Sequence, residues 1–251
     1  MTDAIGAVSS SLEALGREYQ AVAHNLANVS TVGYKRRCHS FIQMLRQHAS
    51  DADAGSPAAQ VQALSAASVL AKPALDMTAG AMTQTGRSLD LAIESDGFFV
   101  VETEGGPLYT RCGVFRTDGN GKLVDADGRG VAGENGQLML PAEVPSEQIN
   151  VAADGTVRAG GTAVGKLKIV RFDQPGGLLP AGGRCLAAPP GLEPQPADSP
   201  RVLQGYQEAS NVNAVEELVS LITLSRLYEA NLKSIQAQDE RMKEILQVAM
   251  A

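Results

Sequence analysis

Apolar residues recur at every third or fourth position near the amino-terminal end of the chain. This spacing predicts a helix whose apolar side chains form a single heptad stripe. Stop signals follow between Asn28 and Gly33, and Gly33 is placed for the left-handed conformation found just past many helix ends. The stripe consists of Ile5, Val8, Leu12, Leu15, Tyr19, Val22, Leu26 and Val29.

A second heptad stripe lies near the other end of the sequence, with Ser225 and Asp239 as polar interruptions. Asn213, followed three residues later by Glu216, is typical of a capped helix start. Two such stripes at opposite ends predict that the two helices pair with each other as a coiled coil. The second stripe consists of Leu218, Leu221, Tyr228, Leu232, Ile235, Met242 and Leu246.

Turn dipeptides separate short apolar or alternating runs in the middle of the chain, which is the pattern of antiparallel strands and hairpins. The fold class we expect is therefore α+β. Long N- and C-terminal helices would pair as a coiled coil, with an inserted and mostly antiparallel β domain between them. The dipeptides are Asp96-Gly97, Asp118-Gly119, Asp127-Gly128, Asn135-Gly136 and Asp154-Gly155.

Composition shifts predict five segments along the chain. Prolines concentrate in the connector near residues 173–201, and small and polar residues form another connector at residues 46–60. The expected segments are an N-terminal helix and following segment (1–45), a linker or extended segment (46–78), a β-rich domain (79–172), a Pro/Gly-rich connector (173–204) and a C-terminal helix (205–251) that pairs with 1–32.

The charge and composition of the 251 residues exclude several classes of protein. A net charge of −7 argues against a nucleic-acid-binding surface. No run approaches ~18 apolar residues, and the first residues lack the cations of a secretion signal, so we expect no membrane span and no cleaved signal peptide. Three cysteines at long spacings indicate neither a disulfide framework nor a zinc site.

Two short patterns suggest chemistry but do not match a complete site. The glycine-rich stretch 160–166 is similar to the start of a phosphate-binding loop, but Leu167 replaces the required hydroxyl residue, so a hairpin turn is favoured. Cys38, His39 and His48 have the right atoms for zinc at a spacing that matches no structural site. We therefore expect no enzyme, no catalytic residue, no cofactor and no metal ligand.

Two separated motifs resemble signatures of the bacterial flagellar basal-body rod and hook proteins. One covers residues 23–35 (AHNLANVSTVGYK), and the other starts at residues 205–217 (GYQEASNVNAVEE) and continues to residues 226–231 (RLYEAN). Runs within residues 85–111 are similar to the inner β domain of these proteins. The motif residues that we carry over are Asn25, Leu26, Ala27, Asn28, Gly33, Ser210, Asn211, Val212, Tyr228 and Glu229.

The resemblance implies a structural subunit of the flagellar basal-body rod, proximal or distal. Such a subunit is exported unfolded by the flagellar type III apparatus, without a cleaved signal peptide. It then polymerises into the periplasm-spanning axial tube that transmits torque from motor to hook. Its implied partners are copies of itself, other rod and hook proteins and the export apparatus, with no nucleic acid and no membrane span.

The residues themselves support self-assembly, because helices with one apolar stripe each remain marginal until neighbouring copies cover them. The stripe residues are therefore the expected self-assembly site. The alternative is a non-flagellar binding module that presents a β domain on a two-helix coiled coil.

Overall fold

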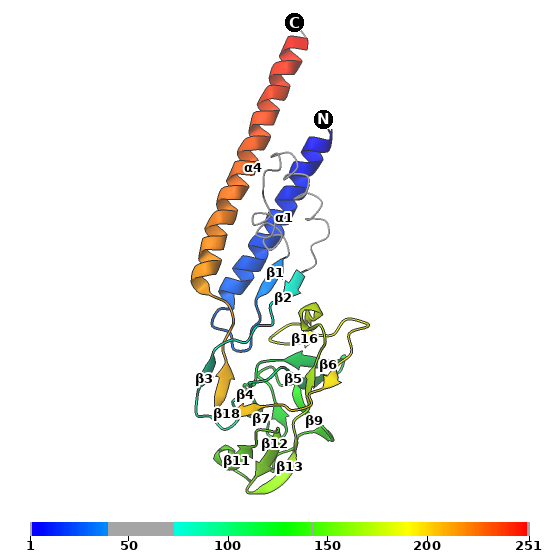
Figure 1. Ribbon diagram of the computed structural model, residues 1–251, viewed down its shortest axis with the longest axis vertical. Coiled ribbons are helices and arrows are strands. Elements are labelled where there is room, and N and C mark those ends of the chain that lie inside the picture. The colour runs from blue at the N-terminus through cyan, green and yellow to red at the C-terminus, as the bar shows by residue number, and fades with distance from the viewer. Residues whose placement is uncertain (1, 40–72, 142, 250–251) are drawn as a thin grey trace. The chain divides into compact units, whose positions relative to one another are not determined.

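The computed structural model describes residues 2–39, 73–141 and 143–249 (Figure 1). These residues belong to two compact units. Of the described residues, the helical unit comprises 2–27, 37–39, 73–74 and 213–249, and the β unit comprises 28–36, 75–141 and 143–212. Residues 46–72 of the expected linker lie outside the described part.

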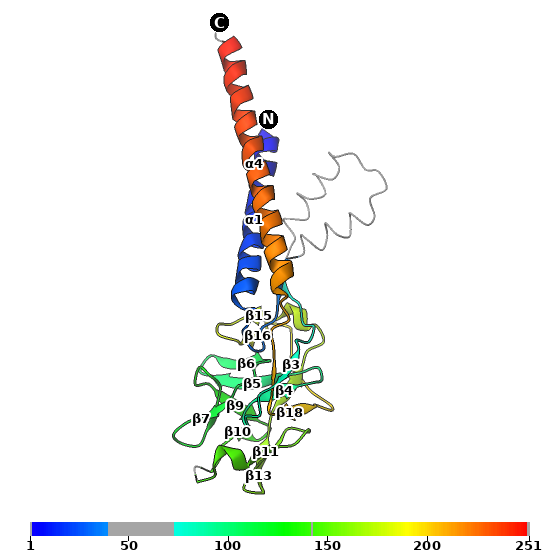
Figure 2. The ribbon, with the colours of Figure 1, turned by 90° about the vertical axis from the view of Figure 1, so that its left-hand side faces the viewer.

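Two long helices form most of the helical unit, α1 (Thr2–Ala27) and α4 (Ala214–Ala249). They lie side by side and antiparallel in both views, and α4 continues beyond α1 (Figures 1 and 2). Local capping sets the start of α4: Val215 N donates to Asn213 Oδ1 (3.1 Å), and the Asn213 amide donates to Glu216 (3.2 Å). Neither helix, over its described residues, contains a stretch apolar enough to cross a bilayer.

Over the described side chains, the apolar contact between the helices is short. Leu15 and Val22 of α1 pack with Leu224 of α4, and Leu221 lies against this cluster. Four other stripe residues remain 39–47% exposed: Tyr19, Leu218, Tyr228 and Leu232. The side chains of Ile5, Val8, Met242 and Leu246 lie outside the described part.

The expected fold class, with its terminal helices paired as a coiled coil, is therefore wrong. Strands are the most numerous elements of the described residues, and the heptad stripes do not form one continuous buried seam. The physical reason lies in α4, where Glu217 and Leu224 face inward while the predicted neighbours Leu218 and Ser225 are exposed. Leu221 belongs to both spacings, so heptad counting cannot choose between them.

A ten-stranded antiparallel sheet is the main feature of the β unit. Its path runs β15-β16-β6-β5-β9-β8-β7, with β10 pairing with β9, β14 with β5, and β17 with β14. The bounds are β5 (Phe98–Thr103), β6 (Gly106–Thr110), β7 (Arg116–Thr117), β8 (Leu123–Val124), β9 (Gly130–Gly133), β10 (Gly136–Gln137), β14 (Ile169–Arg171), β15 (Leu179–Pro180), β16 (Leu186–Ala187) and β17 (Gln195–Pro196).

Smaller sheets complete the described strands. Three strands form the sheet β11-β12-β13, and pairs of strands form β18-β4, β19-β3 and β1-β2. Two short 3-10 helices, η1 (Ser146–Gln148) and η2 (Pro175–Gly177), lie in connections. The bounds are β1 (Arg37–His39), β2 (Pro73–Leu75), β3 (Met82–Gln84), β4 (Leu91–Ile93), β11 (Ile149–Val151), β12 (Thr156–Ala159), β13 (Thr162–Lys166), β18 (Val202–Gln204) and β19 (Tyr206–Glu208).

Strand β5 is buried on both faces and joins two apolar clusters. Phe99 and Val101 belong to one cluster, and Phe98 and Val100 to the other, because successive side chains of a strand point to opposite faces. The Phe99 ring packs edge-to-face on Phe115 with centroids 5.2 Å apart. This double burial makes β5 the centre of the β unit's core.

Gly113 allows a close approach between two backbone segments of this core. Leu91 N donates to Gly113 O (2.9 Å), and a Cβ at Gly113 would collide with the carbonyl of Leu91. We expect Gly113→Ala to lower the free energy of unfolding by about 1–3 kcal/mol, as measured by urea titration. Gly119→Ala is the matched control, since open space surrounds that position. Equal stability of the two variants would contradict this packing.

Candidate functional site

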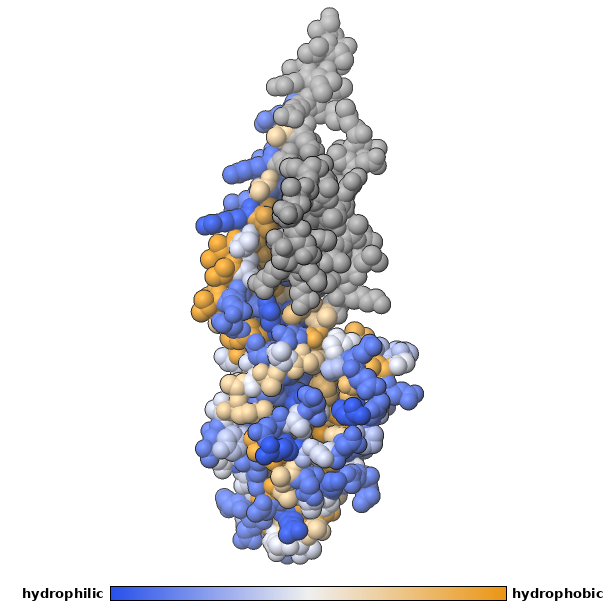
Figure 3. Space-filling model, in the orientation of Figure 1, coloured by the Kyte–Doolittle hydropathy of each residue, from blue (hydrophilic) through white to orange (hydrophobic). Residues whose placement is uncertain are grey.

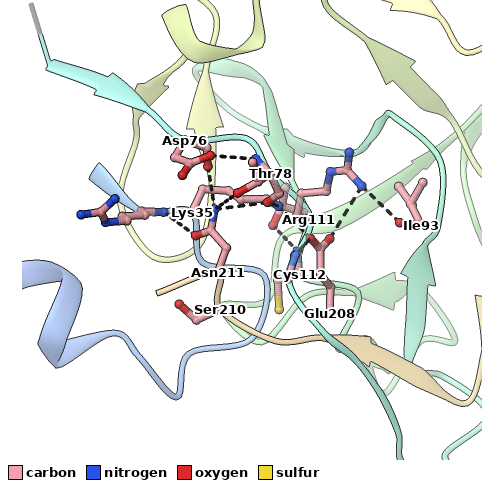
Figure 4. A network of polar contacts seen from close by, with 12 residues as sticks. Lys35, Asp76, Thr78, Ile93, Arg111, Cys112, Glu208, Ser210 and Asn211 are labelled. Atoms are coloured by element: carbon pink, nitrogen blue, oxygen red, sulfur yellow. Dashed lines mark hydrogen bonds and ion pairs between the residues drawn. The ribbon is translucent and has the colours of Figure 1, made fainter. Parts of the chain in front are cut away.

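Segments far apart in the sequence meet in a buried polar cluster of the β unit (Figure 4). The first, residues 33–36, includes the end of the N-terminal motif. The second, residues 76–80, precedes β3. The third, residues 206–211, contains β19, which pairs antiparallel with β3 so that Glu208 lies opposite Met82. Backbone pairing thus places the end of the β unit's sequence beside its beginning.

Glu208 is at the centre of this cluster and is fully buried. Its Oε1 accepts hydrogen bonds from Lys35 Nζ (2.7 Å) and from Gly80 N (3.0 Å). Its main-chain oxygen accepts another from Gly33 N (2.7 Å). Lys35 also donates to the carbonyl of Thr78 (2.6 Å), so this ammonium joins all three segments.

Arg111 is a second buried cation beside the same carboxylate. Its Nη1 donates to the carbonyls of Ile93 (3.2 Å) and Ser95 (3.1 Å) and lies 3.7 Å from Glu208 Oε2. The guanidinium also lies over the Phe98 ring, 5.1 Å from its centroid. One buried carboxylate therefore serves two buried cations.

Burial dominates the electrostatics of both cations. Loss of solvent lowers the pKa of the Lys35 ammonium, and its hydrogen bond to Glu208 opposes that lowering. Burial likewise lowers the pKa of Arg111, and the charge of Glu208 opposes it. Glu208 is therefore the group that keeps two charged side chains tolerable in the interior.

Asn211 extends the cluster with its side-chain amide. Its Oδ1 accepts from Arg36 N (2.8 Å), and its Nδ2 donates to the carbonyl of Asp76 (2.9 Å). Asp76 N in turn donates to the carbonyl of Arg36 (2.9 Å). The Asn211 side chain thus bonds the backbone at both Arg36 and Asp76, where neither segment belongs to a strand.

Gly33 has the conformation that the sequence predicts, with φ of 70°. A second constraint on this position comes from packing, because a Cβ here would collide with the backbone of Cys112. Burial raises the pKa of the Cys112 thiol. The main-chain N–H of Cys112 donates to Thr110 Oγ1 (3.0 Å). The glycine lets the end of the N-terminal motif lie against the backbone of Cys112.

Asn25 has a comparable role inside the helical unit. Its amide donates to the carbonyl of Arg37 (2.9 Å) and accepts from Arg37 N (2.8 Å). The side chain is nearly fully buried, so these two bonds fix how the chain returns along the end of α1. Partial burial and the nearby Arg37 lower the pKa of the adjacent His24.

The structure brings together some of the sequence-predicted residues and separates others. Gly33 and Asn211 meet in the polar cluster, whereas Tyr228 and Glu229 lie on α4. Sequence reasoning missed Glu208, Lys35 and Arg111 as site residues, although all three fall in or beside quoted motifs. Their only signal was a charged residue within a motif, which is usually a solvated side chain.

Of the two patterns that the sequence analysis discounted, the glycine-rich stretch has a structural role, and the other lies partly outside the described residues. The glycine-rich stretch 160–166 forms the turn and second strand of the hairpin β12-β13, and Lys166 lies 2.8 Å from Glu134. His48 lies outside the described residues. The central charges of the polar cluster are enclosed by protein, so the cluster can bind and orient the protein's own backbone segments.

Glu208→Gln should lower the free energy of unfolding by about 3–5 kcal/mol, because Lys35 and Arg111 would lose their buried counter-charge. Urea titration of the full chain measures this. Glu102→Gln makes the same change at an exposed carboxylate with one amide partner and should cost under about 1 kcal/mol. If the two variants unfold at the same urea concentration, the cluster does not hold the β unit.

Comparisons with known proteins agree with these motifs. The family described as "Flagellar hook protein FlgE/F/G D1 domain" matches residues 92–159, and "Flagellar basal body rod FlgEFG protein C-terminal" matches residues 203–248. The chain is 31% identical to the basal-body rod protein FlgG of Agrobacterium fabrum, over 94% of this chain and 95% of that one. It is 34% identical to FlgF of Caulobacter vibrioides (87% and 86%) and 33% identical to FlgF of Escherichia coli (94% and 92%). The chain therefore belongs to the family of flagellar basal-body rod proteins.

Proposed function

We propose that this structural subunit of the flagellar basal-body rod polymerises with copies of itself into the axial helical tube that transmits torque from motor to hook. The observation that supports self-assembly is the uncovered apolar surface of α4. Large apolar side chains there remain 39–69% exposed. They are Val215, Leu218, Val219, Ile222, Leu227, Tyr228 and Leu232.

The helical unit has a small apolar interior of its own. The buried cluster between its helices contains Leu15, Val22 and Leu224. Full burial of a large apolar side chain is worth about 1.5–3 kcal/mol, so covering the exposed residues of α4 by a neighbour contributes several kcal/mol. Assembly would thus stabilise helices whose described side chains share a small apolar cluster in the single chain. We propose the stripe residues of both helices as the carriers of these contacts.

The absence of cross-links between its cysteines suits this chain to export in an unfolded state through the flagellar type III apparatus. None of the three cysteines, all within the described residues, forms a disulfide that would close a loop in the chain. We propose that other rod and hook proteins contact the subunit at the ends of its segment of the tube. The alternative, a non-flagellar binding module on a coiled coil, has no observation in its favour.

Leu232→Asp tests the proposed contact surface. A charge at this partly exposed position should prevent polymerisation, because assembly would bury an unpaired carboxylate. Electron microscopy and light scattering of the concentrated full-length chain measure the polymer.

Leu179→Asp is the control, since it makes the same change at a residue of the β unit that is 47% exposed, against 39% for Leu232. Urea titration should show that both variants unfold as the wild type does. If the Leu232→Asp chain polymerises normally, the stripe is not part of the assembly surface.

A further inference from the structure

Along the described residues, the chain passes between its two units at four places. These connections follow residues 27, 36, 74 and 212. Under the proposed function, neighbouring copies act on the helices, where hydrophobic colour gathers over the first turns of α4 (Figure 3). Torque that enters the helices reaches the β unit through these connections. Unbonded backbone at such places is where hinges form, so the hydrogen bonds at each connection matter.

On the side of the β unit, the Asn211 amide joins three of the connections (Figure 4). Asn211 itself lies beside the connection after residue 212. Its Oδ1 accepts from Arg36 N (2.8 Å), and its Nδ2 donates to the carbonyl of Asp76 (2.9 Å). Asp76 N donates to the carbonyl of Arg36 (2.9 Å), which closes a ring of bonds. The connections after residues 36, 74 and 212 are therefore bonded to one another within the β unit.

On the side of the helical unit, the Asn25 amide joins two of the connections. Asn25 lies just before the connection after residue 27, and Arg37 is the first residue beyond the connection after residue 36. The amide donates to the carbonyl of Arg37 (2.9 Å) and accepts from Arg37 N (2.8 Å). Asn25 is 1% exposed, so water does not compete for these bonds.

The consecutive residues Arg36 and Arg37 link the two sets of bonds. Both main-chain polar groups of Arg36 are bonded within the β unit, and both groups of Arg37 are bonded to Asn25. Each residue has one main-chain donor, one acceptor and two soft dihedral angles. Rotation of the backbone at this connection therefore breaks at least one hydrogen bond, and each set of bonds extends to a further connection.

We propose that Asn25 and Asn211 make the four connections one mechanical coupling, which carries torque from the helices to the β unit along four backbone paths together. This role rests on the proposed function and names the residues that pass the torque on within a subunit. Beside Arg36, the bond from Lys35 to Glu208 (2.7 Å) anchors the same segment to β19. A force that arrives at one connection is thus shared with the others.

Hydrogen exchange of single amides tests the coupling in the unpolymerised full-length chain. Asn211→Ala removes the acceptor of Arg36 N. If the connections are coupled, Arg37 N should also exchange about tenfold faster or more, although its own acceptor is untouched. Asn25→Ala should act in the reverse direction on Arg36 N, because coupling between two sites is reciprocal. The control, Asn150→Ala at an exposed position of β11, should leave both amides at the wild-type rate.

The pattern of exchange separates a coupling from two local bonds. If each variant speeds exchange only at the amide that loses its acceptor, the connections are independent and the proposal is overturned. The amides of β5 show whether the β unit remains folded. If Asn211→Ala unfolds the β unit, Asn25→Ala decides the question, since its bonds lie within the helical unit.

Force spectroscopy of the single chain provides a second readout. Val215→Cys on α4 and Glu102→Cys on β5, both exposed positions, supply handles for pulling the two units apart in a Cys38→Ser background. The two remaining cysteines are buried. At a fixed force, Asn211→Ala should open about tenfold faster or more than the parent chain, whereas Asn150→Ala should not. Equal opening rates for these two variants would overturn the coupling.

Both experiments use the single chain, so they are independent of polymerisation. A wild-type chain that stays monomeric at every concentration would overturn the proposed function, while exchange and force would still decide whether the connections are coupled. Conversely, independent connections in a chain that polymerises would overturn the coupling and leave the proposed function standing.

Discussion

The β unit depends on one buried carboxylate that must satisfy two buried cations. Glu208 binds Lys35 directly and lies near Arg111, and all three are almost entirely removed from solvent. Because an unpaired charge in the interior is very costly, these segments hold together only as a set. The strand pair β19-β3 and the amide of Asn211 then align the flanking backbones. The conformation of both family motifs where they enter the β unit follows from this arrangement.

The helical unit follows a different principle. Its helices share a small apolar cluster, and α4 keeps a second apolar face uncovered. A soluble monomer gains nothing from such a face, whereas a subunit of a polymer gains the burial at every contact. The two units thus differ in what stabilises them. Internal hydrogen bonds and ion pairs stabilise the β unit, whereas we propose that contacts between copies stabilise the helices.

Several features were predictable because they depend on neighbours in sequence. The cap formed by Asn213 and Glu216 requires only three residues of spacing, and the left-handed Gly33 follows from the absence of a side chain. The inward face of α4 was not predictable in this way. Apolar residues surround its first turns, so a spacing through Leu224 competes with the predicted one through Leu218, and packing against Leu15 and Val22 selects Leu224.

The sequence by itself determined the family, through motifs at both ends and in the middle of the chain, and the local signals of helix starts and turns. Only the tertiary structure decided that Lys35 and Glu208, 173 residues apart, share a hydrogen bond, and that the helices meet over a short patch rather than along a coiled coil. Periodicity and capping act through the local backbone and are visible in a linear pattern. An ion pair across the fold and the choice of a packed helix face depend on which surfaces the folded chain brings together.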